Sequence, residues 1–322
     1  MTPELTTETK NRPSLMKRLF WLMRLFGIVL FVVILLKVDL KDVAKQLSFT
    51  DGWLLAAGLS FQFIVLVAKG IRWHLMNAGK NEWKYWKQSL GRFYESYAIG
   101  VVTPARMGEL LKAGHEKGSG NVFTSVIRVI AERGLDIGVF VILAGLSVLT
   151  GAYLKWPDLY SGLIIFSGLA FLIISMFLLA SSKFNVLVNN LVHLLPGKMK
   201  SLHFAHKSFS GSTSAFIITL SLLSNISYFI SCYFLALSTG LEAGFIWTSG
   251  AVAVSGLLNM LPVTIMGVGT RELTFLYVFN SYPQSIVLSF SFLVVLIAQI
   301  GGGLISLAAG QFFLHSNTRK KS

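Results

Sequence analysis

Two short stretches of the chain place a proline, glycines and an arginine with a glutamate between long apolar runs. They are VVTPARMGELLKAG at residues 101–114 and LPVTIMGVGTRELTF at residues 261–275. The residues concerned are Pro104, Arg106, Gly108 and Glu109 in the first stretch and Pro262, Gly267, Gly269, Arg271 and Glu272 in the second. A membrane helix would break there, and lipid tolerates broken backbone and ion pairs only where protein or water satisfies them. The pattern predicts a functional site at the two breaks.

The chemistry that these residue types favour is anion binding. Where a broken helix restarts, its first amide groups and nearby glycines suit an anion such as a phosphate. Arg106 and Arg271 would add bidentate phosphate recognition. Glu109 and Glu272 would pair with the arginines in the empty state, or bind a cationic group or a coupling proton. In an alternative interpretation, each pair only satisfies its own hairpin.

A second group of charges lies in the helical run at residues 121–150. Arg128, Glu132 and Asp136 are spaced four apart and share one helix face, and Arg133 lies three residues before Asp136. Within a membrane these charges must face the protein interior or a water-filled cavity. They indicate a substrate or headgroup pathway, or else an ion-pair cluster that locks the helix to its neighbours. The pathway is favoured because buried ion pairs contribute little stability.

The composition excludes an ordinary soluble protein. The chain has 322 residues, of which 54% are hydrophobic and 13% are charged, against roughly 25% charged in soluble domains. No stretch between the apolar runs approaches the length of a soluble enzyme domain. The net charge of +14 is first a signal of membrane topology and second a hint of anionic lipid partners.

Nucleotide, metal and catalytic sites are not expected. Gly267 and Gly269 lack the preceding strand and the third glycine of a nucleotide-binding fingerprint. His203 and His206 have no acid or cysteine beside them, so no metal site is predicted. Asn225 and Asn259 lie inside apolar runs, where hydrogen bonding between helices is the simplest role. No cofactor and no nucleic acid partner are expected.

The apolar runs predict an all-α polytopic membrane protein with about six full spans and two re-entrant hairpins. The protein would consist of a tail at residues 1–18, one membrane domain at 19–314 with halves at 19–150 and 159–314, and a basic tail at 315–322. The spans are predicted at residues 20–38, 53–71, 121–150, 159–180, 214–237 and 285–313, and the hairpins at 90–117 and 245–279.

The positive charges predict the orientation of the chain. Basic residues at 10–18 and 319–321 place both termini in the cytoplasm. The segment Lys69 to His74 has the basic and aromatic character of a membrane-interface rim. With this topology the two hairpins enter from opposite faces. Opposed broken helices with the same order of proline, glycine, arginine and glutamate indicate an inverted repeat with its site near the midplane.

Four of these motifs together resemble a known family. They are Arg72-Trp73, TPARMGELLKAG, AERGLDIG at residues 131–138 and LPVTIMGVGTREL. In this order they resemble the lysylphosphatidylglycerol synthase transmembrane-region family, the flippase-like membrane half of the multiple peptide resistance factor. The positions that match the family's polar motifs are Pro104, Gly108, Glu109, Glu132, Arg133, Asp136, Gly267, Gly269, Arg271 and Glu272.

The resemblance implies a bacterial or archaeal inner-membrane protein that moves a lipid or a lipid-linked headgroup between leaflets. Synthase members of the family carry a soluble C-terminal aminoacyl-transferase domain, whereas this chain stops soon after its last apolar run. Lipid aminoacylation by this chain is therefore not expected. This chain has Thr103 just before Pro104, whereas the family often has an asparagine near this position. The resemblance therefore does not define the headgroup contacts at the first break.

Three functions are compatible with these features. The favoured one is a flippase-like protein that binds an anionic phospholipid or a lipid-linked headgroup. The second is an accessory protein that presents a lipid carrier to a separate transferase. The third, an intramembrane enzyme acting on headgroups, is least favoured because the sequence shows no nucleophile or metal set.

Overall fold

The structure is a computed structural model that describes residues 40–78, 85–114, 122–150, 158–180, 211–261 and 266–318, with residues 190, 209 and 264. Several predictions fall outside these residues: the first span at 20–38, His203 and His206, Pro262, and the basic residues at both ends of the chain. Every regular element of the described part is a helix, which confirms the all-α prediction.

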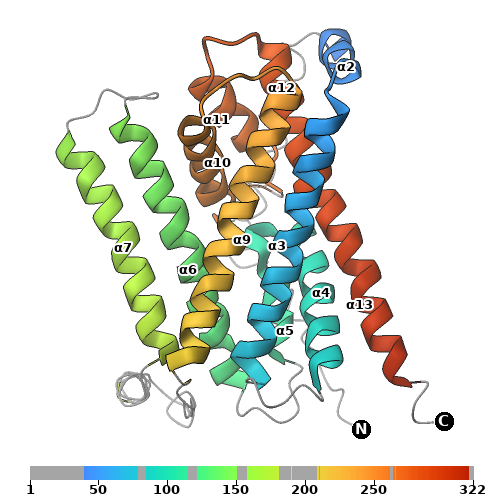
Figure 1. The fold of residues 1–322 in the computed structure, drawn as a ribbon, viewed down its shortest axis with the longest axis vertical. Helices are drawn as coiled ribbons and strands as arrows, with labels where there is room; N and C mark the ends of the chain where they lie inside the picture. The colour runs from blue at the N-terminus through green and yellow to red at the C-terminus, as the bar shows by residue number, and fades with distance from the viewer. Residues whose placement is uncertain are drawn as a thin grey trace, which may run out of the picture.

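The helices run along most of the described chain (Figure 1). Their bounds are α2 Leu40–Ser48, α3 Gly52–Ala78, α4 Trp86–Val102, η2 Pro104–Leu110, α5 Leu111–Gly114, α6 Val122–Leu149, α7 Asp158–Ala180, α9 Gly211–Ser238, α10 Phe245–Asn259, α11 Thr270–Val278, α12 Gln284–Leu293, the π-helical η4 Val294–Gly301 and α13 Gly302–Thr318. The predicted spans after residue 50 agree with these bounds to within a few residues, apart from the end of α3.

Four helical segments are long and apolar enough to cross a membrane: Gly52–Asn77, Tyr160–Leu178, Gly211–Ser238 and Gln284–Leu314. α6 has 28 residues, as many as α9, but the charged residues at 128–136 interrupt its apolar composition. The described part is therefore a helical bundle of membrane-protein character with four candidate membrane spans.

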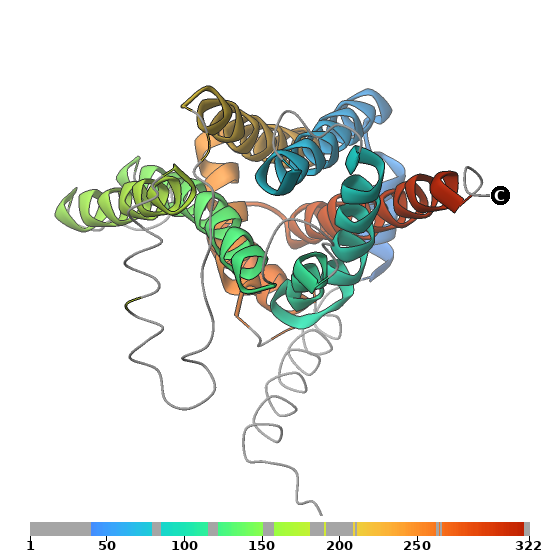
Figure 2. The same cartoon turned by 90° about the horizontal axis from the view of Figure 1, so that it is seen from below.

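The long helices pack in pairs: α3 with α9, α6 with α7, and α4 with α13. Seen from below, α7 and the end of α13 extend to opposite sides of the bundle (Figure 2). Half of the apolar segment of α9 is buried, against 17% of that of α7. α9 is thus a central helix, whereas α7 presents most of its apolar side chains to its surroundings.

Glycines allow the paired helices to approach closely. A Cβ atom at Gly138 of α6 would lie 2.9 Å from the carbonyl oxygen of Gly168 in α7, and the converse distance is the same. Gly91 and Gly310 face each other in the same way between α4 and α13. Between α3 and α9, the hydroxyl of Ser231 donates to the carbonyl of Gly58 at 2.7 Å. Small residues serve this purpose in membrane bundles because burial alone drives little helix association there.

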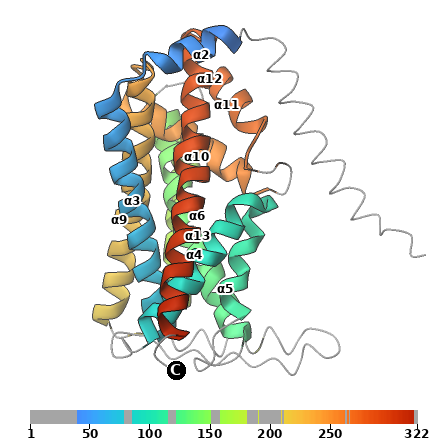
Figure 3. The same ribbon diagram turned by 90° about the vertical axis from the view of Figure 1, so that its right-hand side faces the viewer.

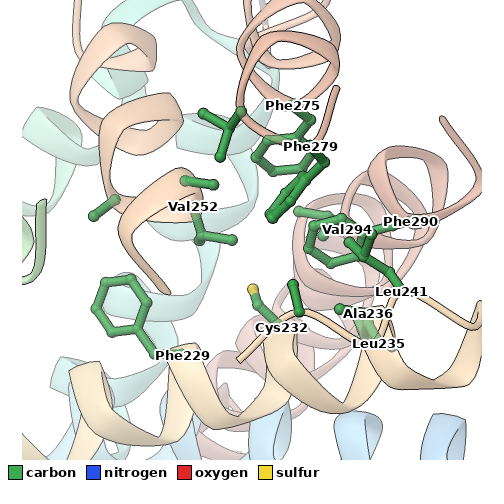
Figure 4. Close-up of a cluster of buried hydrophobic side chains, with 14 of the residues drawn as sticks. Phe229, Cys232, Leu235, Ala236, Leu241, Val252, Phe275, Phe279, Phe290 and Val294 are labelled. Atoms are coloured by element: carbon green, nitrogen blue, oxygen red, sulfur yellow. The ribbon is translucent and has the colours of Figure 1, made fainter. Parts of the chain in front are cut away.

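A buried aromatic cluster holds α11 and α12 against α9 (Figure 4). Phe275 of α11 stacks on Phe290 of α12 with ring centroids 4.9 Å apart, and Phe279 packs at the edge of Phe290. On the opposite side, Cys232 and Leu235 of α9 are fully buried. The helix that follows the second break is therefore fixed by packing on one side.

Both predicted breaks are present. After α4 the chain turns through η2, where Ala105 and Arg106 adopt left-handed φ values of 51° and 53°. After α10, Met266, Gly267 and Gly269 have φ values of 59°, 72° and 87°. Figure 3 shows α4 and α5 in the lower half of the bundle and α10 and α11 in the upper half. The helices that flank the first break and those that flank the second thus lie toward opposite ends of the bundle.

The prediction of an interface rim at residues 69–74 was wrong. α3 continues to Ala78, and Arg72, Trp73 and His74 are 0%, 0% and 1% exposed. These side chains lie inside the bundle because the acids of α6 supply charged partners for Arg72. An arginine at the end of an apolar run can therefore mark a buried ion pair as well as a membrane surface.

Candidate functional site

Two acids of α6 bind the cations at the end of α3. Arg72 places Nη2 2.7 Å from Glu132 Oε1 and Nη1 2.9 Å from Asp136 Oδ1. Lys69, one helical turn earlier, places Nζ 3.0 Å from Asp136 Oδ2. The spacing of four residues between the acids lets one guanidinium group bridge both of them. This part of the cluster locks α3 onto α6.

Glu132 and Arg133 connect α6 to the first break. Lys112 of α5 forms an ion pair with Glu132, and Arg133 of α6 forms one with Glu109 of η2. Arg106 Nε lies 3.0 Å from Glu109 Oε1, and Lys112 Nζ lies 3.8 Å from Glu109 Oε2. Glu109 is therefore shared by three cations.

These ion pairs form one continuous chain, which we call the charge network. Its members are Lys69, Arg72, Arg106, Glu109, Lys112, Glu132, Arg133 and Asp136. Aromatic rings cover two of its cations: Lys112 Nζ lies 4.4 Å from the ring centroid of Trp73, and the guanidinium of Arg106 lies 4.8 Å from that of Tyr97. Such rings stabilise cations away from bulk water.

The backbone of the first break places Arg106 and Glu109. The amide of Gly108 donates to the hydroxyl of Thr103 at 2.8 Å, which closes the turn. A Cβ atom at Gly108 would lie 2.7 Å from the amide nitrogen of Gly100, so only glycine fits where the break crosses α4. Thr103, the residue at which the sequence departs from the family pattern, thus has a structural role in this turn.

At the second break, Arg271 and Glu272 bind each other and their surroundings. Arg271 Nη2 lies 2.8 Å from Glu272 Oε1, and the hydroxyl of Ser291 donates to the same oxygen at 2.6 Å. Glu272 also accepts a hydrogen bond from the amide of Gly269 at 2.6 Å, which caps α11. Arg271 Nε donates to Ser291 at 2.9 Å. Glu272 is therefore bound both by its own break and by Ser291 of α12.

One cavity lies between the two breaks. It has about 80 Å³ of space for the centres of water molecules, enough for several waters. Arg106 comes from the first break, Arg271 and Gly267 from the second, and Arg133 from α6. The other polar side chains of its lining are Lys69, Tyr97, Asp136, Asn225, Tyr228, Ser255, Asn259 and Gln299. Charged groups separated by more than 160 positions in the chain thus face the same space.

A second, largely apolar groove of about 380 Å³ runs between η2, α6 and α7. Ile130, Ile137 and Phe171 are among its apolar lining residues. Arg106 and Arg133 line both the groove and the cavity. The two guanidinium groups therefore stand between a polar space and an apolar one.

The predicted site residues divide into two groups. Arg106, Arg133, Asp136 and Arg271 line the cavity directly, and Glu109, Glu132 and Glu272 hold these residues or their neighbours through ion pairs. Arg128 is not part of the cavity lining. It is 6% exposed, and its Nη1 donates to Asn77 Oδ1 at 3.0 Å, near the end of α3.

The chain matches the family model described as the lysylphosphatidylglycerol synthase TM region over residues 21–306. The chain belongs to this family. The matched region includes both breaks, the charge network and the cavity, and the resemblance noted in the sequence is thereby confirmed. A search of curated proteins found no match. Membership of this family and the apolar helices together identify an integral membrane protein.

The sequence alone did not predict that Lys69, Arg72 and Lys112 belong to the charge network. One signal was available: Glu132 and Asp136 on one face of a membrane helix need cations from other helices. Lys69 and Arg72 are three residues apart and therefore share a face of α3. Asn225 was assigned a hydrogen-bonding role between helices. This is confirmed, because its Nδ2 donates to Asp136 Oδ1 at 3.0 Å.

Proposed function

We propose that this protein is a flippase-like membrane protein that moves a phospholipid or a lipid-linked headgroup between the leaflets. The phosphate of the headgroup would occupy the cavity between the breaks, with Arg106 and Arg271 as its direct partners. No cofactor is required for this step. The observation that carries the proposal is that arginines from both breaks line one cavity.

The arrangement of the hairpins supports this function. In the proposed topology both are re-entrant, enter from opposite membrane faces and meet near the midplane, as in transporters built from inverted repeats. Their positions at opposite ends of the bundle agree with that topology (Figure 3). Both termini would be cytoplasmic, and the membrane would be the bacterial inner membrane. A cavity reached from each end in turn would let a headgroup cross without entering lipid.

The ion pairs around the cavity supply the binding groups. Arg106 and Arg133 are 26% and 22% exposed at their side chains, while their shared partner Glu109 is 8% exposed. A phosphate could therefore reach the guanidinium groups from the cavity while Glu109 holds them from behind. Arg271 is fixed by Ser291 and Glu272 and offers its remaining donors to the same space. Charge-assisted hydrogen bonds of this kind bind phosphates strongly.

The proposal can be tested with the purified chain in vesicles that contain fluorescent phosphatidylglycerol or phosphatidic acid. An impermeant quencher reports how quickly the labelled lipids reach the outer leaflet. The chain should accelerate this movement for at least one of the lipids. Arg271→Gln combined with Glu272→Gln, which preserves the net charge, should reduce the rate at least about tenfold, equivalent to the loss of one charge-assisted contact.

The matched control is Lys41→Gln with Lys45→Gln in α2, a helix that contributes no residue to the cavity lining. This control should translocate lipid at the wild-type rate. Wild-type rates in the Arg271 and Glu272 variant would remove the second break from the site. A wild-type chain that binds these lipids but moves neither of them would favour the accessory role, in which the lipid is presented to a separate transferase.

A further inference from the structure

We propose that the headgroup bound in this cavity carries two negative charges, as a phosphate monoester does, on a hydrocarbon chain that lies in the apolar groove. The inference rests on the proposed function and specifies its substrate class. It follows from the charge balance of the network and from the position of its two most exposed cations.

Among the residues that the structure describes, the charge network has an excess of positive charge. It contains five cations, Lys69, Arg72, Arg106, Lys112 and Arg133, and three carboxylates, Glu109, Glu132 and Asp136. Its formal charge is +2. The other ion pair at the cavity, Arg271 with Glu272, is neutral. Unbalanced charge in a membrane interior is costly, so an anion of charge −2 would bring the network to neutrality.

The excess charge lies where a ligand can reach it. Arg72 and Lys112 are 0% and 1% exposed and are enclosed by Glu132 and its neighbours. Arg106 and Arg133 have more than a fifth of their side-chain surface exposed, and both depend mainly on one carboxylate, Glu109. Two guanidinium groups that share one acid retain capacity for further acceptor oxygens. A phosphate monoester offers three such oxygens.

The groove provides the place for the hydrocarbon chain. It borders the cavity at Arg106, Arg133 and Met260, which line both spaces, and most of its other lining is apolar side chains of η2, α6 and α7. α7 lies at the edge of the bundle (Figure 2), and only 17% of its apolar segment is buried. A lipid whose hydrocarbon chain lay in this groove would keep its phosphate at the two arginines and its hydrocarbon chain against apolar side chains. The same lipid would thus occupy both spaces.

Charge distinguishes this substrate class from related lipids. Phosphatidylglycerol carries one negative charge and would leave the network at +1. A lysylated phosphatidylglycerol, with two ammonium groups on one phosphodiester, would add positive charge to a positive site. Inorganic phosphate carries the required charge but has no hydrocarbon chain to occupy the groove. Phosphatidic acid, which is a phosphate monoester with hydrocarbon chains, and these three ligands therefore separate the contribution of the headgroup charge from that of the hydrocarbon chain.

The experiment measures the affinity of the purified full-length chain in detergent for short-chain phosphatidic acid, phosphatidylglycerol, lysylphosphatidylglycerol and inorganic phosphate. At pH 8 we expect phosphatidic acid to bind at least about tenfold more tightly than the other three ligands, the effect of one additional charge-assisted contact. The second pKa of a phosphate monoester is about 6. At pH 5 the preference over phosphatidylglycerol should therefore fall below about threefold.

Two variants with opposite expected effects keep the test independent of folding. Arg106→Gln with Arg133→Gln should abolish the preference for phosphatidic acid. Glu109→Gln should strengthen phosphatidic acid binding about threefold or more, because it removes the acid that competes for both arginines. A variant that only damaged the fold would not bind more tightly. Lys41→Gln with Lys45→Gln removes two charges outside the cavity and should leave the affinities unchanged.

Equal affinity for phosphatidic acid and phosphatidylglycerol at pH 8 would overturn the inference, and so would weaker binding by Glu109→Gln. Inorganic phosphate that bound as tightly as phosphatidic acid would overturn the role of the groove. None of these results would affect the proposed function if the vesicles still showed movement of phosphatidylglycerol. Conversely, tight phosphatidic acid binding without any lipid movement would retain the charge inference and reject transport.

Discussion

Arg72 is the residue that pairs with both buried acids of α6. Its guanidinium bridges Glu132 and Asp136 and also donates to the hydroxyl of Ser221 at 3.1 Å. Both acids are less than 5% exposed as whole residues. Without Arg72, Glu132 would retain Lys112, and Asp136 would retain Lys69 and Asn225. The residue serves chiefly to hold the acids in the interior.

Replacement of Arg72 by methionine should therefore destabilise the protein strongly. The expected loss is about 3–5 kcal/mol in the free energy of unfolding, because one change leaves two buried carboxylates short of a partner. Chemical denaturation in detergent, followed by tryptophan fluorescence, measures it. Arg72→Met combined with Glu132→Gln and Asp136→Asn should recover part of the loss. A loss below about 1 kcal/mol for the single variant would show that the cluster does not lock α3 to α6.

At the scale of the elements, the two breaks owe their shape to different residues. Gly269 has φ 87° and ψ −51°, a conformation that residues with a side chain rarely adopt. Ala105 has φ 51° and ψ 20°, in the left-handed helical region where alanine is tolerated at a cost. The second break thus requires its glycine, whereas the first holds an alanine under strain.

The two positions should respond oppositely to an exchange of alanine and glycine. Gly269→Ala should destabilise by about 1–3 kcal/mol, because the new Cβ atom makes the native backbone unfavourable. Ala105→Gly should change stability by less than about 1 kcal/mol, because relief of strain offsets the greater freedom of the unfolded chain. Unfolding midpoints in detergent give both values. Equal losses at both positions would contradict this account of the breaks.

The contact between α6 and α7 depends on a glycine on each helix. A Cβ atom at Gly168 would lie 2.7 Å from Ile142 Cγ1 and 2.9 Å from the carbonyl of Gly138. Gly162, on the same helix α7, has no atom within 4 Å of the corresponding Cβ position. Substitution of Gly162 is therefore a matched control for substitution of the closely packed Gly168. The groove between η2, α6 and α7 lies along the same pair of helices.

Gly168→Ala should separate α6 from α7 and destabilise by about 1–3 kcal/mol, the usual effect of forcing atoms into a filled interior. Gly162→Ala should be neutral or stabilising by up to about 1 kcal/mol, because alanine favours a helix more than glycine does. Thermal unfolding of the two variants in the same detergent compares them directly. A greater loss for Gly162→Ala would show that propensity rather than contact sets the stability of α7.

At the scale of the whole molecule, the decisive feature is that the two halves of the chain contribute to one cavity. Arg106 belongs to the first half and Arg271 to the second, and both line it. Two separate sites would require two cavities, each with its own arginine. Under the proposed function, this shared cavity would make the two arginines parts of one binding site.

This arrangement predicts how substitutions of the two arginines combine. Arg106→Gln and Arg271→Gln should each slow lipid movement about tenfold or more. The double variant should be little slower than the slower single variant, because residues that act as one unit are not additive. The vesicle assay described above gives all four rates. If the two effects multiplied, the arginines would act at independent sites.

The sequence by itself determined the element types, most of the helix bounds and the candidate breaks. Apolar runs of span length become helices because lipid leaves the backbone no other hydrogen-bond partners. Pro104, Gly108, Gly267 and Gly269 interrupt those runs for local reasons of backbone geometry. Charges in α6 had to face the interior for the same reason of solvation. All of these are properties of short segments, and they can therefore be inferred without knowledge of neighbours.

Only the tertiary structure decided which charges meet. Lys69 and Arg72 of α3 reach Glu132 and Asp136 with their long side chains, Lys112 reaches Glu132 because α5 packs against α6, and Arg128 donates instead to Asn77. An ion pair depends on distances of a few ångströms between side chains, and these distances follow from helix packing. The excess of two positive charges and its position at Arg106 and Arg133 thus emerged only once the helices were assembled.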